Sequence, residues 1–226
     1  KLGHPKLAQF FNRYATYNGS DPHRAPAMLH VIPHLEHGIG TFLPEEGMRA
    51  IPLHLAGLAQ SLGVRILTQT PADRILHDGT RVTGVLDGHG VEHPADLVVS
   101  NADLHPTYRR LLPDRRPPER ILKQERSTSG VIFYWGVRGT HGDLGLHNIL
   151  FSKDYEAEFA SIAKTGSPGE DPTVYINITS KELPKDAPEG HENWFVLMNV
   201  SADPEQWGEE SVATLRSQVL EKIQRT

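Results

Sequence analysis

Apolar side chains recur at helical spacing in several parts of the chain. Near the start they follow the i, i+3, i+4, i+7 pattern that forms one face of an amphipathic helix, at Leu7, Phe10, Phe11 and Tyr14. Asn18 and Gly19 predict the end of that helix, because glycine adopts the left-handed conformation that closes a helix. Further helices are predicted over residues 25–35, with a kink or an end at Pro33, and over 47–62, 154–164 and 209–225.

Short runs rich in β-branched and aromatic residues predict strands. Asp78 and Gly79 predict a two-residue hairpin turn between two of them. The run 95–100 is apolar on both faces, which is typical of a buried parallel strand, whereas the run 173–179 alternates between apolar and polar residues. The predicted strands are residues 63–70, 74–76, 81–86, 95–100, 129–137, 173–179 and 193–200.

Together these elements predict an α/β chain with mixed α+β character. Residues 47–104 have the pattern of a piece of an α/β domain, whereas the later residues predict an antiparallel or mixed sheet that carries helices. Residues 106–120 are rich in proline and arginine, which predicts a boundary or a surface loop. With 226 residues, the chain has the length of one large domain or two small ones.

Composition narrows the classes of function. Apolar residues make up 38% of the chain, enough for a folded core, yet no apolar run is long enough to cross a membrane as a helix. The chain has no cysteine, which excludes disulfides and thiol catalysis. Because its net charge is -5, we expect no nucleic-acid partner.

Motifs for nucleotide binding and nucleophilic catalysis are absent from the sequence. The pairs Gly38 with Gly40 and Gly88 with Gly90 lack the third glycine of G-x-G-x-x-G, and neither pair joins a strand to a helix. Neither a P-loop nor G-x-S-x-G occurs, and H-E-x-x-H fails because Phe195 stands at its last position. The motifs therefore predict no catalytic side chain.

Thirteen histidines raise the question of a metal site. His30, His34 and His37 would share one face of a continuous helix, as zinc ligands can. However, Pro33 interrupts the segment, and Glu36 is the only obvious fourth ligand. We favour polar surface and loop histidines here, and we predict no metal.

Two larger groups each allow two interpretations. A basic cluster fits either a solvated face or a patch that meets anionic lipid headgroups: Arg109, Arg110, Arg115, Arg116, Arg120, Lys123 and Arg126. An aromatic group fits either an ordinary core or the lining of an apolar ligand channel: Phe133, Tyr134, Trp135, Phe151, Tyr155 and Tyr175. The solvated face and the core are the simpler interpretations.

Seven strings, spread in order over the chain, are specific in combination although each alone is weak. They are FFNRYATYNGSDPHRAPA, HLEHGIGTFLPEEGM, GVRILTQTPADRIL, LVVSNADLHPTYRRLL, LHNILFSKDY, DPTVYINIT and DAPEGHENWFVL. The combination resembles the bacterial carotenoid desaturases of the phytoene desaturase type, a branch of the FAD-dependent amine-oxidase-like superfamily. The resemblance implies a central fragment, since relatives carry a G-x-G-x-x-G turn before this region and a second glycine-rich flavin segment after it.

The resemblance also implies the domain organisation. Residues 1–46 correspond to the helical first part of the substrate domain, and residues 47–104 to the return segment of the Rossmann-like FAD-binding domain. Residues 105–226 correspond to the sheet and helices of the substrate domain. The expected fold class is therefore α/β with α+β character, in which part of an FAD-binding domain accompanies a substrate domain.

For contacts with FAD, the resemblance implies Ala72, Asn101 and Ala102. At the position of Ala72, relatives place the backbone of a valine against the adenine-ribose half of FAD, and alanine offers the same backbone. The turn at Asn101 and Ala102 approaches the cofactor in relatives. Relatives usually have two consecutive glycines at positions 46 and 47, whereas this sequence has Glu46 before Gly47. A side chain at position 46 makes a positive φ at that residue costlier. The acid and base of the family lie before this region, so catalytic residues stay unknown.

The function implied for the full-length parent is FAD-dependent desaturation of a carotenoid or related polyene by hydride transfer to flavin; the chain alone is expected to be inactive. We expect a substrate channel partly lined by Phe133, Trp135, Phe151 and Tyr175. Because a polyene is insoluble, we also expect a cytoplasmic enzyme docked peripherally on the membrane surface. The alternatives are a non-catalytic lipid- or polyene-binding module and, less favoured, a histidine-based metal enzyme. The oligomeric state stays open.

Overall fold

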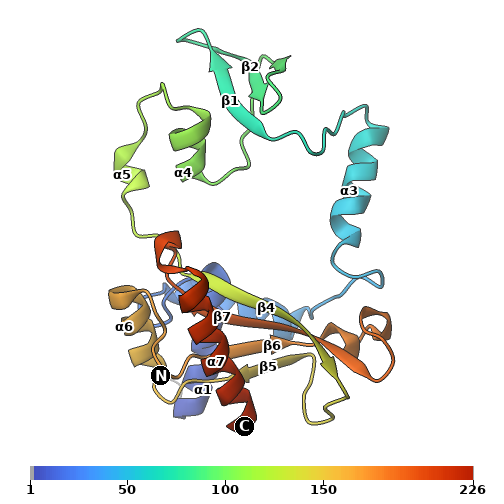
Figure 1. Cartoon of the computed structure of the whole chain (residues 1–226), viewed down its shortest axis with the longest axis vertical. Helices are drawn as coiled ribbons and strands as arrows, with labels where there is room; N and C mark the ends of the chain where they lie inside the picture. Colours follow the sequence, from blue (N-terminus) through green and yellow to red (C-terminus); the bar gives the residue numbers. More distant parts are fainter. Residues whose placement is uncertain (1–2, 226) are drawn as a thin grey trace. The chain divides into compact units, whose positions relative to one another are not determined.

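The computed structural model describes residues 3–225 and divides them into two compact units (Figure 1). We call residues 3–47 together with 126–225 the sheet unit, and Met48–Glu125 the hairpin unit. The main hydrophobic core of the described residues belongs to the sheet unit.

The sheet unit is built on a four-stranded antiparallel sheet in the order β4-β7-β6-β5. Its strands are β4 (Ser129–Arg138), β5 (His147–Leu150), β6 (Val174–Asn177) and β7 (His191–Val200). β4 and β7 pair over their whole length, from Ser129 opposite Val200 to Arg138 opposite His191. The strands predicted over 129–137, 173–179 and 193–200 are confirmed.

One face of this sheet packs against α7 (Glu209–Arg225), as Figure 1 shows. Successive side chains of a strand point to opposite faces, so alternate residues of β7 supply the core. These buried residues are Trp194, Val196, Met198 and Val200, and Leu215 and Val219 cover them from the helix. The helix predicted over 209–225 is confirmed, and each fully buried apolar side chain stabilises this packing by about 1.5–3 kcal/mol.

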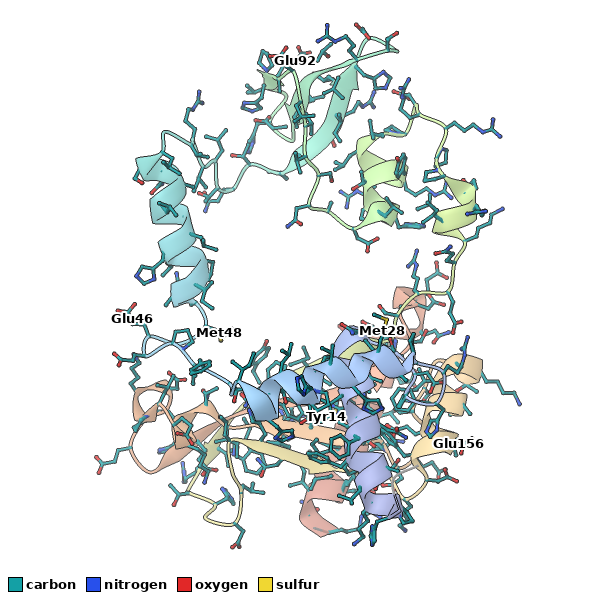
Figure 2. All side chains as sticks on the ribbon, turned by 180° about the vertical axis from the view of Figure 1, so that it is seen from behind. Tyr14, Met28, Glu46, Met48, Glu92 and Glu156 are labelled. Atoms are coloured by element: carbon teal, nitrogen blue, oxygen red, sulfur yellow. The ribbon has the colours of Figure 1, made fainter. Side chains whose placement is uncertain are left out.

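Helices from the start of the chain cover the opposite face of the sheet, which is the side seen in Figure 2. They are α1 (Pro5–Asn12), η1 (Arg13–Asn18), η2 (Ala27–His30) and α2 (Val31–Gly38). Gly19 closes η1 with a φ of 64°, as the sequence predicts. The chain is not kinked or ended at Pro33 as predicted: η2 passes directly into α2 at Val31, and α2 continues through Pro33 to Gly38. Pro33 is tolerated in the first turn of α2, where its missing N–H leaves no helical hydrogen bond unmade.

A further helix, α6 (Tyr155–Thr165), completes the sheet unit. It begins after Asp154, whose carboxylate accepts a hydrogen bond from Ala157 N at 2.9 Å, and it ends at Gly166 with a φ of 80°. The helix predicted over 154–164 is therefore confirmed. The connecting segments contain three short 3-10 helices: η4 (Thr179–Lys181), η5 (Pro184–Asp186) and η6 (Pro204–Gln206).

The hairpin unit contains α3 (Ala50–Ser61) and an antiparallel sheet in the order β1-β2-β3. The strands are β1 (Ala72–His77), β2 (Val82–Asp87) and β3 (Glu92–Pro94), and short helices follow as α4 (Leu104–Pro106), η3 (Thr107–Leu111) and α5 (Glu119–Leu122). The predicted hairpin is present, but its turn spans Asp78–Arg81 rather than two residues. The Asp78 carboxylate holds this longer turn by accepting hydrogen bonds from Thr80 N and Arg81 N.

Two strands predicted in the hairpin unit, residues 63–70 and 95–100, have no regular structure. Their apolar side chains are exposed, including those of Ile66, Leu97 and Val99. A strand needs a hydrogen-bonded neighbour along its length, but within the described residues neither segment is a strand of a sheet, and Ala95 N only reaches β2 through one hydrogen bond to Thr83 O at 3.1 Å. The predicted burial of 95–100 is therefore not observed.

The second boundary between the units lies after Glu125, whereas the sequence predicts it after residue 104. Polar contacts connect the intervening residues to the hairpin unit. Arg115 Nη1 donates a hydrogen bond to Gly79 O at 2.6 Å, and Arg74 forms an ion pair with Asp114 at 3.7 Å. The assignment of the units to an FAD-binding and a substrate domain stays a prediction.

Candidate functional site

A cavity of about 830 Å³ lies in the sheet unit, between the N-terminal helices and the face of the sheet that α7 does not cover. The helices contribute Phe10, Arg13, Tyr14, Thr16, Tyr17 and Glu36 to its wall. The strands contribute Gly130, His147, Ile149, Tyr175, Leu197 and Asn199 to its floor. Its volume is in the range of small-molecule binding sites, and aromatic and aliphatic side chains make up much of the lining.

The floor of the cavity follows from the alternation of side chains along the strands. Leu197 and Asn199 are the residues of β7 that point away from the α7 core. Tyr175 lies opposite Leu197 on β6, and Gly130 lies opposite Asn199 on β4. The cavity therefore occupies the second face of a sheet whose first face is filled by the core.

Neutral hydroxyl groups and aromatic rings dominate the wall of the cavity. Burial and, secondly, a hydrogen bond with Glu36 raise the pKa of Tyr14 to about 12. Burial also raises the pKa of Tyr175, whose hydroxyl forms a 2.8 Å hydrogen bond with His147 Nδ1. Both phenols stay protonated at neutral pH, and their ring faces suit contact with a flat conjugated ligand.

The structure places the four predicted channel residues in different environments. Tyr175 lies on the cavity. Phe133 and Trp135 stack with their ring centroids 5.6 Å apart and pack against the core on the α7 side of the sheet. Phe151 packs edge-on against Tyr155 at the start of α6. The cavity therefore lies on the face of β4 opposite to Phe133 and Trp135.

Sequence reasoning missed two buried polar residues of the cavity, Arg13 and Asn199. A pattern in the sequence could have indicated the first. Phe10, Arg13, Tyr14 and Tyr17 follow the i, i+3, i+4, i+7 spacing, which places an arginine within an apolar helical face. The side chain of Arg13 is indeed buried, with its Cζ 5.9 Å from the ring centroid of Tyr175.

The residues predicted to contact FAD belong to the hairpin unit. Ala72 is the first residue of β1, where it pairs with Asp87, and it is exposed. Asn101 and Ala102 are exposed in the turn before α4, and Ala102 O accepts a hydrogen bond from Thr107 Oγ1 at 3.3 Å.

The chemistry of these three residues is compatible with the edge of a flavin site. The methyl side chains of Ala72 and Ala102 leave the backbone open to a planar ring, and the exposed amide of Asn101 offers both a donor and an acceptor. Phosphate binding usually takes a glycine-rich turn at the start of a helix, and this sequence contains no such fingerprint. The three residues can therefore contribute contacts to a flavin, but they supply no pyrophosphate site.

The histidine cluster lies beside a separate, open pocket. His30, His34 and His37 border this pocket, and His37 Nε2 lies 3.4 Å from the hydroxyl of Tyr14. Among residues 3–225, no three His, Cys, Asp or Glu side chains gather closely enough to hold a metal ion. Over the same residues, no helix combines the length and the apolar character needed to cross a membrane.

Comparison with known families identifies the class of protein that this fold represents. The model for flavin containing amine oxidoreductases matches residues 2–225. The chain belongs to this family, and a flavin is the cofactor that the family implies.

Individual relatives narrow the resemblance further. The chain is 50% identical over 225 residues to the 1-hydroxycarotenoid 3,4-desaturase of Flavobacterium sp. (strain P99-3), covering 100% of this chain and 46% of that protein. It is 37% identical over 185 residues to the zeta-carotene-forming phytoene desaturase of Myxococcus xanthus, covering 81% of this chain and 36% of that protein. The chain thus spans less than half the length of these curated relatives.

A solved structure supports the fold. An oxidoreductase from Methanosarcina mazei superposes on the chain with a TM-score of 0.65, covering 96% of this chain and 48% of that protein. The sequence identity is 16%, so this likeness concerns the fold alone.

Proposed function

We propose that the whole protein is an FAD-dependent oxidoreductase that desaturates a carotenoid or a related polyene. The observation that carries the proposal is the 50% identity with a protein named 1-hydroxycarotenoid 3,4-desaturase. The cavity adds support, because its volume and its aromatic lining suit a long conjugated hydrocarbon. The name of this relative also favours a hydroxylated carotenoid as the substrate.

In this proposal, the residues of this chain bind and orient the polyene and keep water away from it. When bound, FAD supplies the acceptor for the hydride equivalent that leaves the substrate. Burial of a hydrocarbon stabilises the complex by roughly 25 cal/mol per Å² of apolar surface. Ile149, Leu197 and the ring of Tyr175 therefore provide affinity through apolar contact. No acid or base is assigned to a residue of this chain.

We further propose that Ala72, Asn101 and Ala102 contact FAD, with the backbone of Ala72 at the adenine-ribose half. Their exposure, their small or amide side chains and the membership of the chain in a flavin family support this assignment. The hairpin unit then serves the cofactor and the sheet unit serves the substrate.

Docking on a membrane surface, on its cytoplasmic side, completes the proposal, because the substrate is dissolved in lipid. The basic cluster, which lies in the hairpin unit except for Arg126, is the candidate contact. Within it, Arg109 forms a two-pronged ion pair with Glu119 at 2.8 and 3.0 Å, and Arg115 is hydrogen-bonded to Gly79 O. Arg116 and Arg120 are exposed and can meet anionic headgroups.

The central test uses the whole protein, carotenoid in liposomes and two matched variants. Leu197→Asn places an amide of similar size on the cavity floor, whereas Leu220→Asn makes the same change on exposed α7. We expect extracted FAD at about one per chain, a red shift of the carotenoid spectrum, and a KM raised about tenfold by Leu197→Asn alone. Carotenoid binding without flavin and without a spectral shift would favour the non-catalytic binding module.

A further inference from the structure

Three polar side chains on the cavity have buried atoms without hydrogen-bond partners. These atoms are Arg13 Nη1, Thr128 Oγ1 and Asn199 Nδ2, which form no hydrogen bond of good geometry with residues 3–225, although the Arg13 guanidinium also interacts with the Tyr155 hydroxyl. The residues Arg13 and Asn199 are only 7% and 5% exposed. Proteins pair nearly all such groups, because an unpaired buried donor is costly, and a charged one more so. Three residues that line one cavity therefore hold unused hydrogen-bonding capacity just beneath its surface, which a rotation of their side chains brings to a ligand atom.

Thr128 and Asn199 lie close together on the floor of the cavity. Asn199 pairs with Gly130, and Thr128 comes two residues before Gly130, so that both side chains belong to the same face of the sheet. Thr128 N also donates a hydrogen bond to Gly19 O at 2.7 Å, which connects this corner of the sheet to the end of η1. Gly130 has no side chain, and Leu197 borders the space above it, with Leu197 Cδ1 3.5 Å from the position that a Cβ would take.

Arg13 reaches the same region from the helical wall. Its Cζ lies 5.9 Å from the ring centroid of Tyr175, and Tyr175 pairs with Leu197, two residues from Asn199 on the same face of the sheet. Diagonal neighbours on a sheet are about 7–8 Å apart, a span that an arginine side chain and a small ligand group bridge together.

No counter-charge within the described residues neutralises Arg13 through an ion pair. The phenols of Tyr17, Tyr155 and Tyr175 feel its charge, Tyr155 also through a hydrogen bond, and burial raises the pKa of all three, to about 12 for Tyr155. These phenols are neutral at physiological pH. Glu36 also lines the cavity, but it interacts with the Tyr14 hydroxyl.

We propose that Arg13, Thr128 and Asn199, which we call the oxygen-binding group, bind a hydroxyl or carbonyl oxygen on the substrate and thereby select an oxygenated polyene over a plain hydrocarbon. The inference rests on the proposed function and assigns its substrate selectivity to named residues. A neutral oxygen accepts hydrogen bonds from the guanidinium and the amide, which a hydrocarbon cannot do. A hydrocarbon in the cavity would leave the buried charge unpaired, and this penalty is the source of the selectivity.

The cavity favours a neutral oxygen over a carboxylate. Glu36 contributes a second charge of opposite sign to the same wall, so an anionic ligand would meet a like charge. A hydroxyl or a carbonyl meets no such penalty.

The test compares a hydroxyl-terminated acyclic carotenoid with the same chain lacking the hydroxyl, both in liposomes, on the flavin-loaded whole protein. Arg13→Met keeps the length of the side chain and removes its charge and its donors, and Arg216→Met makes the same change on exposed α7 as a control. We expect the ratio of kcat/KM for the hydroxylated over the plain substrate to fall about tenfold or more in Arg13→Met, and to stay unchanged in Arg216→Met. An unchanged ratio in Arg13→Met would overturn the proposal.

A second measurement keeps the inference separable from the proposed reaction and from misfolding. In thermal unfolding, the hydroxylated carotenoid should raise the Tm of the unsubstituted protein more than the plain chain does, and Thr128→Val with Asn199→Leu should abolish that difference. If desaturation fails but the difference in Tm is present, the proposed reaction is wrong and the oxygen-binding group stands. Equal Tm shifts with both carotenoids mean that the unpaired atoms bind water, and the inference fails.

Discussion

At the scale of single residues, Glu192 concentrates more polar contacts than the other carboxylates of the sheet unit described above. It is 3% exposed and accepts hydrogen bonds from His141 N, Lys181 Nζ and Trp194 Nε1 at 3.0, 2.7 and 2.9 Å. Burial alone would raise the pKa of Glu192, but these donors and the His141 ring outweigh it and lower the pKa to about 2. Glu192 therefore links β7 to the loop after β4 and to η4.

The lowered pKa of Glu192 predicts a specific dependence of stability on pH. Its stabilising effect is complete above the ordinary pKa near 4.5 and is lost as the pH falls toward 2. Glu192→Gln should lower the free energy of unfolding at pH 7 by on the order of 2–3 kcal/mol, and this difference should shrink below pH 4.5. Urea unfolding followed by tryptophan fluorescence measures it. Glu189→Gln, at an exposed site, is the control, and equal effects of both variants would contradict the prediction.

At the scale of elements, Glu158 connects α6 to the residue before β6. Unlike the pKa of Glu192, the pKa of Glu158 is raised in the fold. It is 3% exposed and accepts hydrogen bonds from Thr173 N at 2.8 Å and Thr173 Oγ1 at 2.6 Å. Here burial outweighs the hydrogen bonds and raises the pKa of Glu158. The helix is therefore attached by a carboxyl group whose charged form is disfavoured in the fold.

Because burial disfavours the charged carboxylate of Glu158, we predict that the neutral amide of glutamine can replace it. The stabilising effect of Glu158 is complete below its ordinary pKa of 4.5 and declines as the pH rises through its raised folded pKa. Glu158→Gln should therefore be at least as stable as the unsubstituted protein at pH 8, whereas Glu158→Ala should lose about 1–3 kcal/mol because Thr173 is left without its partner. Thermal unfolding at pH 4 and pH 8 provides the comparison. A Glu158→Gln protein that is as unstable as Glu158→Ala at pH 8 would show that the charge itself is required.

At the scale of the whole molecule, the two units differ in how they bury apolar surface. In the sheet unit both faces of the sheet are covered. The core and α7 cover one face, and the N-terminal helices cover the other, with the cavity between them and the sheet. The hairpin unit exposes large apolar side chains along α3, including Leu53, Leu55 and Leu58. Exposed apolar surface of this extent is typical of contact sites for further protein or for lipid.

The proposed membrane contact yields a prediction for the whole protein. Arg116→Glu combined with Arg120→Glu should weaken binding to liposomes with anionic headgroups by about tenfold or more, since each basic side chain near such a surface contributes about 1 kcal/mol. Both residues are exposed, and neither is among those that hold the hairpin unit together through Glu119 or Gly79. Sedimentation with liposomes measures the effect, and neutral liposomes are the control. Unchanged sedimentation would identify the basic cluster as an ordinary solvated face.

The sequence by itself determined the family and most elements of the sheet unit, although β5 was not predicted. Alternation along 173–179, which contains β6, and helical spacing along α7 are local properties, and each predicts its element without knowledge of the partner. The same local patterns predicted extended segments at 63–70 and 95–100, but pairing depends on neighbours, and these segments have no regular structure.

Tertiary structure alone decided which face of the sheet carries the cavity. A period of two divides β4 into two faces, with Phe133 and Trp135 on one and Ile132 and Tyr134 on the other, and alternation does not say which face meets the core. The packing of α7 decides which face meets the core. Phe133 and Trp135, which the sequence predicts in the channel, pack against this core. Burial of Arg13 depends in the same way on the sheet beneath its helix, because a charged residue on an apolar helical face is buried only when something covers that face.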